Sequence, residues 1–354
     1  MPLSATDSIS PAFEHTRQQL LRPFKLGQWT RLALVGLFAG ESCSGGGSGF
    51  NFNVPSHAGT THHDFLSIAS PSWSLLAPLL VLALIAIPVI WLLLLYLNSR
   101  MRFVLFDSVV AKRCEIGKMW RQRRQPALQY FLFQVVVTLA MLSGTVVLIG
   151  VPALIAFLLG WFSPPREHLA PLILSGIFLF FVFMAWLVLS AVVHVFTKDF
   201  VVPQMALENI SAFDGWRRLW AMMRSDKSGY AGYGGMKVVL AIGAALAVGI
   251  VAIVAIIILL IPFGGLAAIT LLAGKVAGLG WNVFTITAAI VGGSVFLLIV
   301  FYAVALISVP VIVFFPAYSV YFFASRYPRL GDLLYPPPPL PPPAPILPAP
   351  EPIG

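Results

Sequence analysis

Five long stretches of the chain contain no charged side chain, and they constrain the fold more than any other feature of the sequence. They cover residues 74–98, 128–161, 172–197, 238–262 and 286–325. An α-helix needs about 20 consecutive apolar residues to cross a bilayer, and each stretch exceeds that length. The sequence therefore predicts an all-α, polytopic helical membrane protein.

The composition of the whole chain supports this prediction. Hydrophobic residues make up 59% of the 354 residues and charged residues only 10%, whereas soluble domains carry about 25% charged residues. So few charges cannot cover the surface of a soluble globule of this size, which argues against a soluble enzyme.

A sixth span is predicted from a weaker signal near the N-terminus. Residues 29–40 form a shorter apolar run, and a long leading region with several basic side chains precedes it. No good small-x-small cleavage site follows the run, as a secretory signal would require. We therefore expect a retained first span, which gives six transmembrane helices within residues 32–325.

The basic residues predict how these spans are oriented. With six spans, 20 of the 22 Lys and Arg residues fall on one face of the membrane, and Arg166 and Lys275 fall on the other. The positive-inside rule places the basic face in the cytoplasm. We therefore expect a multi-pass protein of the cell (inner or cytoplasmic) membrane with both termini in the cytoplasm.

The same topology divides the rest of the chain into regions. It predicts a cytoplasmic N-terminal segment (1–31), an extracytoplasmic loop rich in Gly, Ser and Asn (41–73), basic cytoplasmic connections (99–127 and 198–237) and a proline-rich cytoplasmic tail (326–354). Proline runs adopt extended polyproline II. We therefore expect a disordered tail that is either a docking peptide for a protein partner or a solvated spacer.

Amphipathic helices are predicted in the cytoplasmic regions. Ser211 is a plausible N-cap with Asp214 at the third helical position, and Arg217 and Arg218 lie off the apolar stripe, which suits a helix at headgroup level. The stripe has spacings of three and four residues and contains Phe213, Trp216, Trp220 and Met223. In the N-terminal segment, the apolar side of the predicted helix contains Phe13, Leu20, Leu21 and Phe24.

A weak internal repeat accompanies these helices. Trp29, Trp120 and Trp216 each lie near a Gly and before basic residues, and each precedes two predicted spans. The span exits also match in part, at residues 103–110, 195–202 and, without an acidic residue, 313–320. We infer a threefold parallel repeat of an interfacial helix plus a transmembrane hairpin. The alternative is that any hairpin membrane protein places Trp and Arg at its interfaces.

The sequence offers little that would support catalysis. His194 is the one ionisable side chain in the five clear spans, and intramembrane ionisable residues would be the first functional candidates. Neither a metal-ligand spacing nor a base beside a nucleophile is present. We therefore expect no enzymatic activity, no cofactor and no metal site, and we assign the histidines of the outer loop to a flexible polar loop.

The acidic residues at the span exits are the main binding-site candidates. Asp107 and Asp199 lie where helices leave the membrane, and Glu208 follows. They either form ion pairs with nearby arginines or build, with Arg217 and Arg218, a headgroup-sized pocket on the cytoplasmic face. The interfacial candidates also include Trp29, Trp120 and Trp216.

The net charge of +9 indicates which partners to expect. Each basic side chain near an anionic membrane surface contributes about 1 kcal/mol of attraction. We therefore expect membrane lipids with anionic headgroups as partners, and no nucleic acid.

A short block also resembles a known group of proteins. Residues 196–208, followed by Trp216-Arg-Arg218, are similar to an uncharacterised family of prokaryotic membrane proteins related to the membrane domain of glycerophosphoryl diester phosphodiesterases. The resemblance covers most of residues 15–325 and implies a six-span membrane domain of unknown activity. It does not imply phosphodiesterase activity, because the His-Arg-Gly and Glu-Asn-Thr motifs of the catalytic domain do not occur.

Two functions remain open from the sequence. The first is a non-enzymatic membrane protein that binds lipid or partner proteins through its basic interfacial helices and its tail. The second is a transporter or lipid-translocating protein in which helices broken at Pro152, Pro262 and Pro310 line a path. Gly and Pro also serve ordinary helix packing in membranes, so substrate flux across reconstituted vesicles separates the two functions.

Overall fold

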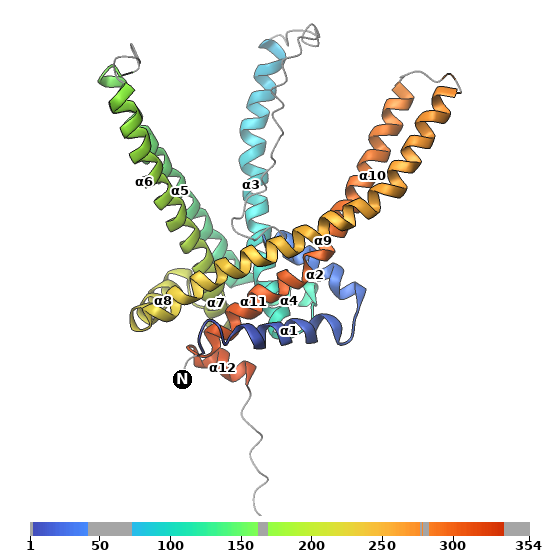
Figure 1. The fold of residues 1–354 in the computed structure, drawn as a ribbon. Helices are drawn as coiled ribbons and strands as arrows, with labels where there is room; N and C mark the ends of the chain where they lie inside the picture. Colours follow the sequence, from blue (N-terminus) through green and yellow to red (C-terminus); the bar gives the residue numbers. More distant parts are fainter. Residues whose placement is uncertain (1–2, 42–72, 162–168, 277, 279–282, 336–354) are drawn as a thin grey trace, which may run out of the picture.

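The computed structural model describes residues 3–41, 73–161, 169–276, 278 and 283–335. Within these residues the chain forms α-helices and one π-helical turn, without a strand. Three long arms rise from a common base of shorter helices (Figure 1). The predicted outer loop after residue 41 and the proline-rich part of the tail lie outside the described residues.

The arms are built from long apolar helices. They are α3 (Trp73–Val110), the pair α5 (Arg124–Leu158) and α6 (Leu169–Phe196), and the pair α9 (Lys227–Val276) and α10 (Val283–Ile307). Five helical segments of the described chain are long and apolar enough to cross a membrane. The prediction of a multi-pass helical membrane protein is confirmed at this level.

The predicted first span is a short helix in the structure. Helix α2 (Leu26–Phe38) has 13 residues, which corresponds to about 20 Å, whereas the hydrocarbon core of a bilayer is about 30 Å thick. The Asn98 amide of α3 donates to the Phe38 carbonyl at 2.9 Å, so α2 ends beside the lower part of α3. A sixth span stays a prediction.

The structure also places residue 41 differently from the predicted topology. Glu41 was expected in the outer loop and Lys198 in a cytoplasmic connection, on opposite sides of the membrane. In the structure, the Lys198 ammonium lies 2.5 Å from the Glu41 carboxylate. Because α2 is too short to carry Glu41 across a bilayer, both residues lie at the junction between the arms and the base.

The base holds the packed core of the protein. Its core contains the lower part of α3, the π-helical turn η3 (Thr197–Val201), α7 (Val202–Glu208) and α11 (Val309–Ala324). Fully buried side chains from all three span exits meet there: Phe103, Phe200, Phe322 and Phe323, each with 0% exposure. The remaining base helices pack around this core and are α1 (Ile9–Leu21), α2, α4 (Ile116–Gln122), α8 (Ala212–Ser225) and α12 (Pro328–Leu334).

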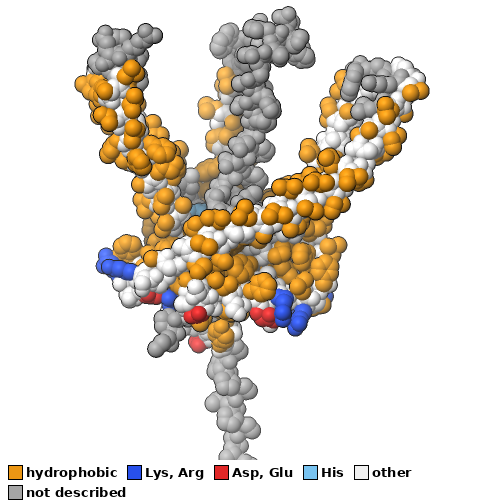
Figure 2. Space-filling view, in the orientation of Figure 1, with side chains coloured by type: hydrophobic (Ala, Val, Ile, Leu, Met, Phe, Trp, Pro, Cys, Tyr) orange, Lys and Arg blue, Asp and Glu red, His pale blue; other side chains and the backbone are white. Residues whose placement is uncertain are grey.

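The arms expose their apolar side chains, in contrast to the base. Near the middle of the three arms, Leu84, Phe181 and Ile250 are 75%, 66% and 64% exposed. The charged side chains visible in Figure 2 gather at the base, while the two outer arms show hydrophobic side chains along their length. This distribution is typical of helices that face lipid.

Proline does not break the arm helices in the way that the transporter hypothesis requires. Helix α5 continues through Pro152, and α9 continues through Pro262. A helix boundary does occur at Ser308, between α10 and α11 and close to Pro310. The predicted breaks are therefore wrong at the first two positions, where neighbouring groups in a membrane helix can satisfy the freed backbone.

Helix α1 uses a polar face to cap the end of α3. The His15 imidazole Nε2 lies 2.9 Å from the carbonyl of Val109, and the Gln19 amide donates to the carbonyl of Ser108 at 3.0 Å. The last four carbonyls of a helix lack partners within that helix. Gln19 supplies a donor to the Ser108 carbonyl, and His15 adds a second donor to the Val109 carbonyl, which also accepts from the Lys112 N–H at 3.2 Å.

Most of the predicted apolar side of the N-terminal segment is exposed in the structure, so its contact with a membrane surface stays a prediction. Phe13, Leu21 and Phe24 are 62%, 55% and 59% exposed, and Leu20 is buried. Burial, together with the positive charge of Lys112, lowers the pKa of His15 below its ordinary value. His15 is thus neutral, and its Nε2–H donates to the α3 carbonyl.

Candidate functional site

A π-helical turn positions the central site. Between α6 and α7, the Val202 N–H donates to the carbonyl of Thr197, five residues earlier. Pro203 follows this turn. Proline has no N–H, and its ring clashes with the carbonyl four residues before it, which is that of Asp199. The wider turn accommodates Pro203 and leaves Lys198 and Asp199 directed into the base.

Five charged side chains meet at this turn, and we name them the central ion cluster: Glu41, Arg102, Lys198, Asp199 and Lys237. Lys198 pairs with Glu41, and Lys237 pairs with Asp199. The Tyr233 hydroxyl donates to Asp199 at 2.9 Å. Both carboxylates are only 2% exposed. Burying a charged side chain costs several kcal/mol, and a close, hydrogen-bonded partner of opposite charge is needed to offset that cost.

Each acidic member of the cluster lies against basic members of it. Burial alone would favour a protonated Glu41, but the charges of Lys198 and Arg102 outweigh it and lower the pKa of Glu41. Asp199 has both the Lys237 ammonium and the Tyr233 hydroxyl as donors. The cluster therefore contains three basic and two acidic side chains.

Arg102 is the member without a carboxylate in contact. It is 4% exposed, and its Nη2 donates to the carbonyl of Ala39 at 2.9 Å. Its Nε and Nη1 are buried and have no acceptor within hydrogen-bond distance among the described residues. The guanidinium also lies 5.9 Å from the centre of the Tyr130 ring, and its positive charge contributes to the lowered pKa of Glu41.

A small cavity adjoins the cluster. Its volume is about 30 Å³, and it is lined by Glu41, Arg102, Lys198 and Asp199, by Ser319 of α11, and by apolar side chains of α3, α7 and α11. A single water needs roughly 10–15 Å³ of such space. The cavity therefore has room for about two water molecules or one ion of similar size.

The other predicted acidic residues lie in separate ion pairs. Asp107 accepts two hydrogen bonds from Arg123, at 2.9 and 3.1 Å, and Arg123 also donates to the Ala206 carbonyl. Glu208 pairs with Arg218 at 2.6 Å and accepts a hydrogen bond from the Tyr327 hydroxyl. These contacts fasten the ends of α3, α5, α7 and α8 to one another.

The predicted pocket of Asp107, Asp199, Arg217 and Arg218 is therefore not the cavity that adjoins the central ion cluster. Of these four residues, Asp199 lines the cavity. Arg217 is 83% exposed and lies 3.2 Å from Asp214 on its own helix. The expectation of ion pairing with nearby arginines describes Asp107 and Glu208 correctly.

The three predicted interfacial tryptophans each bind their helix to the base in a different way. The Trp29 indole donates to the Leu20 carbonyl at 3.1 Å. The Trp120 ring stacks against the Arg100 guanidinium, with 4.5 Å between the centre of the ring and Cζ of Arg100. The Trp216 indole donates to the Thr197 hydroxyl at 3.0 Å, which supports the π-helical turn directly.

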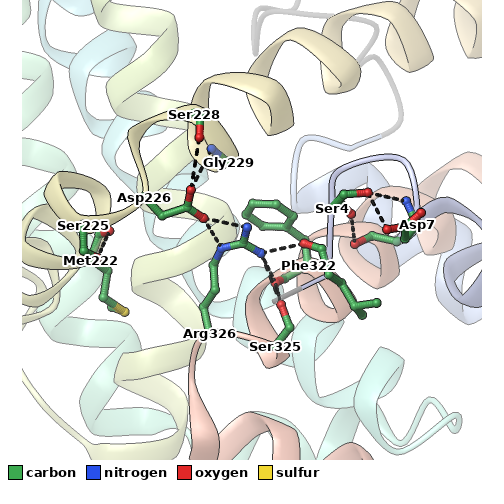
Figure 3. A network of polar contacts seen from close by, with 12 residues as sticks. Ser4, Asp7, Met222, Ser225, Asp226, Ser228, Gly229, Phe322, Ser325 and Arg326 are labelled. Atoms are coloured by element: carbon green, nitrogen blue, oxygen red, sulfur yellow. Dashed lines mark hydrogen bonds and ion pairs between the residues drawn. The ribbon is translucent and has the colours of Figure 1, made fainter. Parts of the chain in front are cut away.

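A second polar network ties the third arm to the base (Figure 3). Arg326, just after α11, donates to the carboxylate of Asp226 at 2.7 and 3.0 Å and to the Leu3 carbonyl at 2.9 Å. Its guanidinium also stacks 3.9 Å from the centre of the Phe322 ring. Hydrogen bonds from Arg326 and from the Gly229 N–H lower the pKa of Asp226, so this carboxylate is ionised.

The sequence reasoning missed Glu41, Arg102, Lys198 and Lys237. A usable signal existed for Arg102, because it is a charged residue between two apolar runs, residues 74–97 and 103–106, that one helix joins. Nothing local marks Glu41 or Lys237, since their partners lie on other helices. Among the described residues, no group of three His, Cys, Asp or Glu side chains is placed to hold a metal ion.

Comparison with known proteins gives one match. Residues 3–333 match a family of unknown function, DUF7544. No curated protein and no solved structure matches the chain, and these findings do not support the resemblance to the membrane domain of glycerophosphoryl diester phosphodiesterases. Because the match spans the base, all three arms and the central ion cluster, the protein belongs to the DUF7544 family of unknown function.

Proposed function

We propose that this protein is a non-enzymatic, lipid-binding membrane domain that holds lipid between its three arms. The observation that carries the proposal is the divergence of the arms from a packed base (Figure 1). Their most apolar windows are between 0% and 17% buried. Exposed hydrophobic surface of this extent is stable when acyl chains or a partner's helices cover it.

The base would lie at the cytoplasmic surface of the cell (inner) membrane. The basic side chains on α4 and α8 are exposed, as are Phe213 (65%) and Trp220 (51%) beside them. This pairing of cations with aromatic side chains suits the headgroup level of an anionic leaflet. Both termini would then be cytoplasmic, and the proline-rich tail would be available to a protein partner.

We also propose that the fold is a threefold repeat. The chain passes three times through the same order: a helix containing Trp29, Trp120 or Trp216, then an arm, then an exit segment in the core of the base. Superposition of the three units is the test, and arms that run in unrelated directions from their tryptophan helices would overturn the idea.

The transporter or lipid-translocating alternative has less support. It requires interrupted helices, whereas α5 and α9 continue through Pro152 and Pro262. The interruption that the structure shows beside charged residues, η3, lies in the base. Substrate flux across reconstituted vesicles above that of empty controls would favour the alternative.

The lipid-binding proposal is tested by native mass spectrometry of the protein released gently from its own membrane. We expect a stoichiometric anionic lipid that is lost when Arg217 and Lys118, both exposed at the base, are changed to Gln. The matched control is Arg166→Gln, at the opposite end of an arm in the predicted topology. The proposal would be overturned if the wild type, the variant with both Arg217→Gln and Lys118→Gln, and the control retained equal amounts of lipid, or if the wild type carried no lipid.

A further inference from the structure

We propose that the turn between α1 and α2 inserts into the cytoplasmic leaflet of the membrane and binds its anionic headgroups. We name residues 21–27 the α1–α2 corner. The inference rests on the proposed placement of the base at the cytoplasmic surface of the membrane, and it adds a contact that is separate from lipid between the arms. It follows from the exposure of the corner, its fixed conformation, its charge and its place on the base.

The α1–α2 corner exposes large apolar side chains. Every residue from 21 to 27 is exposed, and Leu21, Phe24 and Leu26 are 55%, 59% and 56% exposed. Leu20, one position earlier, is buried in the core of the base. Single exposed apolar side chains are ordinary on soluble surfaces, but a group of them marks a contact with a membrane or a partner. The corner is therefore a surface that another apolar phase covers.

Hydrogen bonds across the corner hold it in this conformation. The Gln28 amide donates to the Gln19 carbonyl at 3.3 Å, and the Trp29 indole donates to the Leu20 carbonyl at 3.1 Å. Both carbonyls belong to the last turn of α1, where a helix has no partners of its own for them. The Phe24 ring also lies 5.5 Å from the Trp29 ring, between ring centres. The apolar side chains are therefore exposed by a fixed turn and not by fraying of a helix end.

The charge of the corner indicates an anionic surface as its occupant. Arg22, Lys25 and Arg31 are exposed, and none of the three forms an ion pair within the part of the chain that the structure describes. The sequence has no acidic residue between Glu14 and Glu41. Cations beside exposed aromatic and aliphatic side chains are typical of a segment at the headgroup level of an anionic leaflet.

The place of the corner on the base favours a bilayer over a protein partner. Helix α2 runs from the corner to α3, where the Asn98 amide donates to the Phe38 carbonyl. On the outer side of α2, Leu34 follows the cations and is 45% exposed. Cations followed by apolar surface toward the arms match the order of headgroups and acyl chains in a leaflet. In Figure 1 the corner lies at one end of the base and α8 at the other, so two contacts would fix the orientation of the base on the membrane.

The test places a fluorophore at the corner of the full-length protein, in nanodiscs that contain anionic lipid. In a background with Cys43→Ser and Cys114→Ser, an NBD label at Leu26→Cys should have blue-shifted emission. Nitroxide groups on the acyl chains should quench it, because an interfacial segment lies about 5–10 Å into the boundary between headgroups and chains. Blue-shifted emission that nitroxide lipid does not quench would mean that protein covers the corner, and it would overturn the proposal.

Leu333→Cys is the matched control for this label. Leu333 is 50% exposed and lies beside Asp332 on α12, which is on the side of the base away from the arms (Figure 1). We expect nitroxide lipid to quench the label at Leu26→Cys severalfold more strongly than the label at Leu333→Cys. Equal quenching at the two positions would overturn the insertion of the corner.

The role of charge is tested in the same labelled protein. We expect stronger quenching in anionic than in zwitterionic nanodiscs, and loss of most of this difference in the variant with Arg22→Gln, Lys25→Gln and Arg31→Gln. The variant with Arg217→Gln and Lys118→Gln should keep the difference, because both positions lie outside the corner. Equal quenching of the wild type in both kinds of nanodisc would overturn the assignment of anionic headgroups.

Failure of this inference is distinguishable from failure of lipid binding between the arms. A corner that nitroxide lipid does not quench, in a protein that retains lipid in native mass spectrometry, would overturn the present inference alone. A quenched corner in a protein that carries no lipid in native mass spectrometry would overturn the proposed function and support the corner as a membrane contact.

Discussion

The ion pair between Asp199 and Lys237 offers a quantitative test of the central ion cluster. The Asp199 side chain is 2% exposed and that of Lys237 is 13% exposed. Asp199→Asn keeps the shape of the side chain and an acceptor for the Tyr233 hydroxyl, but it leaves the ammonium without a counter-charge. Removing one partner of a buried pair costs about 3–5 kcal/mol, and Lys237→Met should cost a similar amount.

The double variant separates this explanation from a general loss of packing. Asp199→Asn combined with Lys237→Met leaves neither charge isolated, so we expect it to be more stable than the sum of the single effects by about 2–3 kcal/mol. The assay is equilibrium unfolding in detergent of the wild type, both single variants and the double variant. Effects that add within about 0.5 kcal/mol would refute the reasoning.

An exposed ion pair of the same protein provides the control. Arg217 and Asp214 lie 3.2 Å apart, with side chains 83% and 47% exposed. Exposed pairs on one helix typically contribute about 0.3–0.5 kcal/mol. The cycle of Arg217→Gln with Asp214→Asn should therefore show much weaker coupling than the buried pair.

Three further predictions concern the base. Gly36→Ala should destabilise the protein by about 1–3 kcal/mol, because the new Cβ would lie 2.5 Å from Ile312 of α11. The control is Gly27→Ala on the same helix, where no atom lies within 4 Å of the new Cβ, so this variant should be neutral or more stable. Both effects are measured as shifts of the unfolding midpoint. The pKa of His15 is lowered from 6.5 in the folded protein. Its contribution to stability is therefore complete above that pH and is lost as the pH falls below it, because the unfolded chain takes up the proton first. In His15→Gln the unfolding free energy should depend less steeply on pH between 7 and 5, and an unchanged slope would contradict this. Trp216→Phe removes the hydrogen bond to the π-helical turn and should cost about 0.5–1.5 kcal/mol of unfolding free energy, with a larger loss of amide-exchange protection in η3 than in α12.

The arms and part of the base could be predicted from the sequence because local signals define them. The uncharged stretches correspond to the helices of the arms, except that the last stretch also contains α11 of the base. The predicted N-cap of α8 is confirmed, since the Ser211 hydroxyl accepts from the Asp214 N–H at 3.2 Å. Such features depend on residues within a few positions of one another, so a single sequence carries them.

The central ion cluster could not be predicted because it depends on how separate arms converge. Glu41 and Lys198 are 157 positions apart in the sequence and form their pair only after α2 has docked against α3. The polar contact between α1 and α3 could not be predicted for a similar reason, since His15 and Gln19 are buried against carbonyls at the end of α3. Their polarity is understandable only once the acceptors on α3 are known.

The most direct test of the whole account is the depth of the arms in a bilayer. In a background with Cys43→Ser and Cys114→Ser, single cysteines at Leu84, Phe181 and Ile250, one on each arm, would carry spin labels, with Lys118 at the base as the reference. We predict that the three arm positions are accessible to oxygen dissolved in lipid and protected from a water-soluble nickel reagent, while the base position shows the opposite pattern. An arm position that the nickel reagent reaches as readily as the base would contradict a membrane domain with three lipid-facing arms.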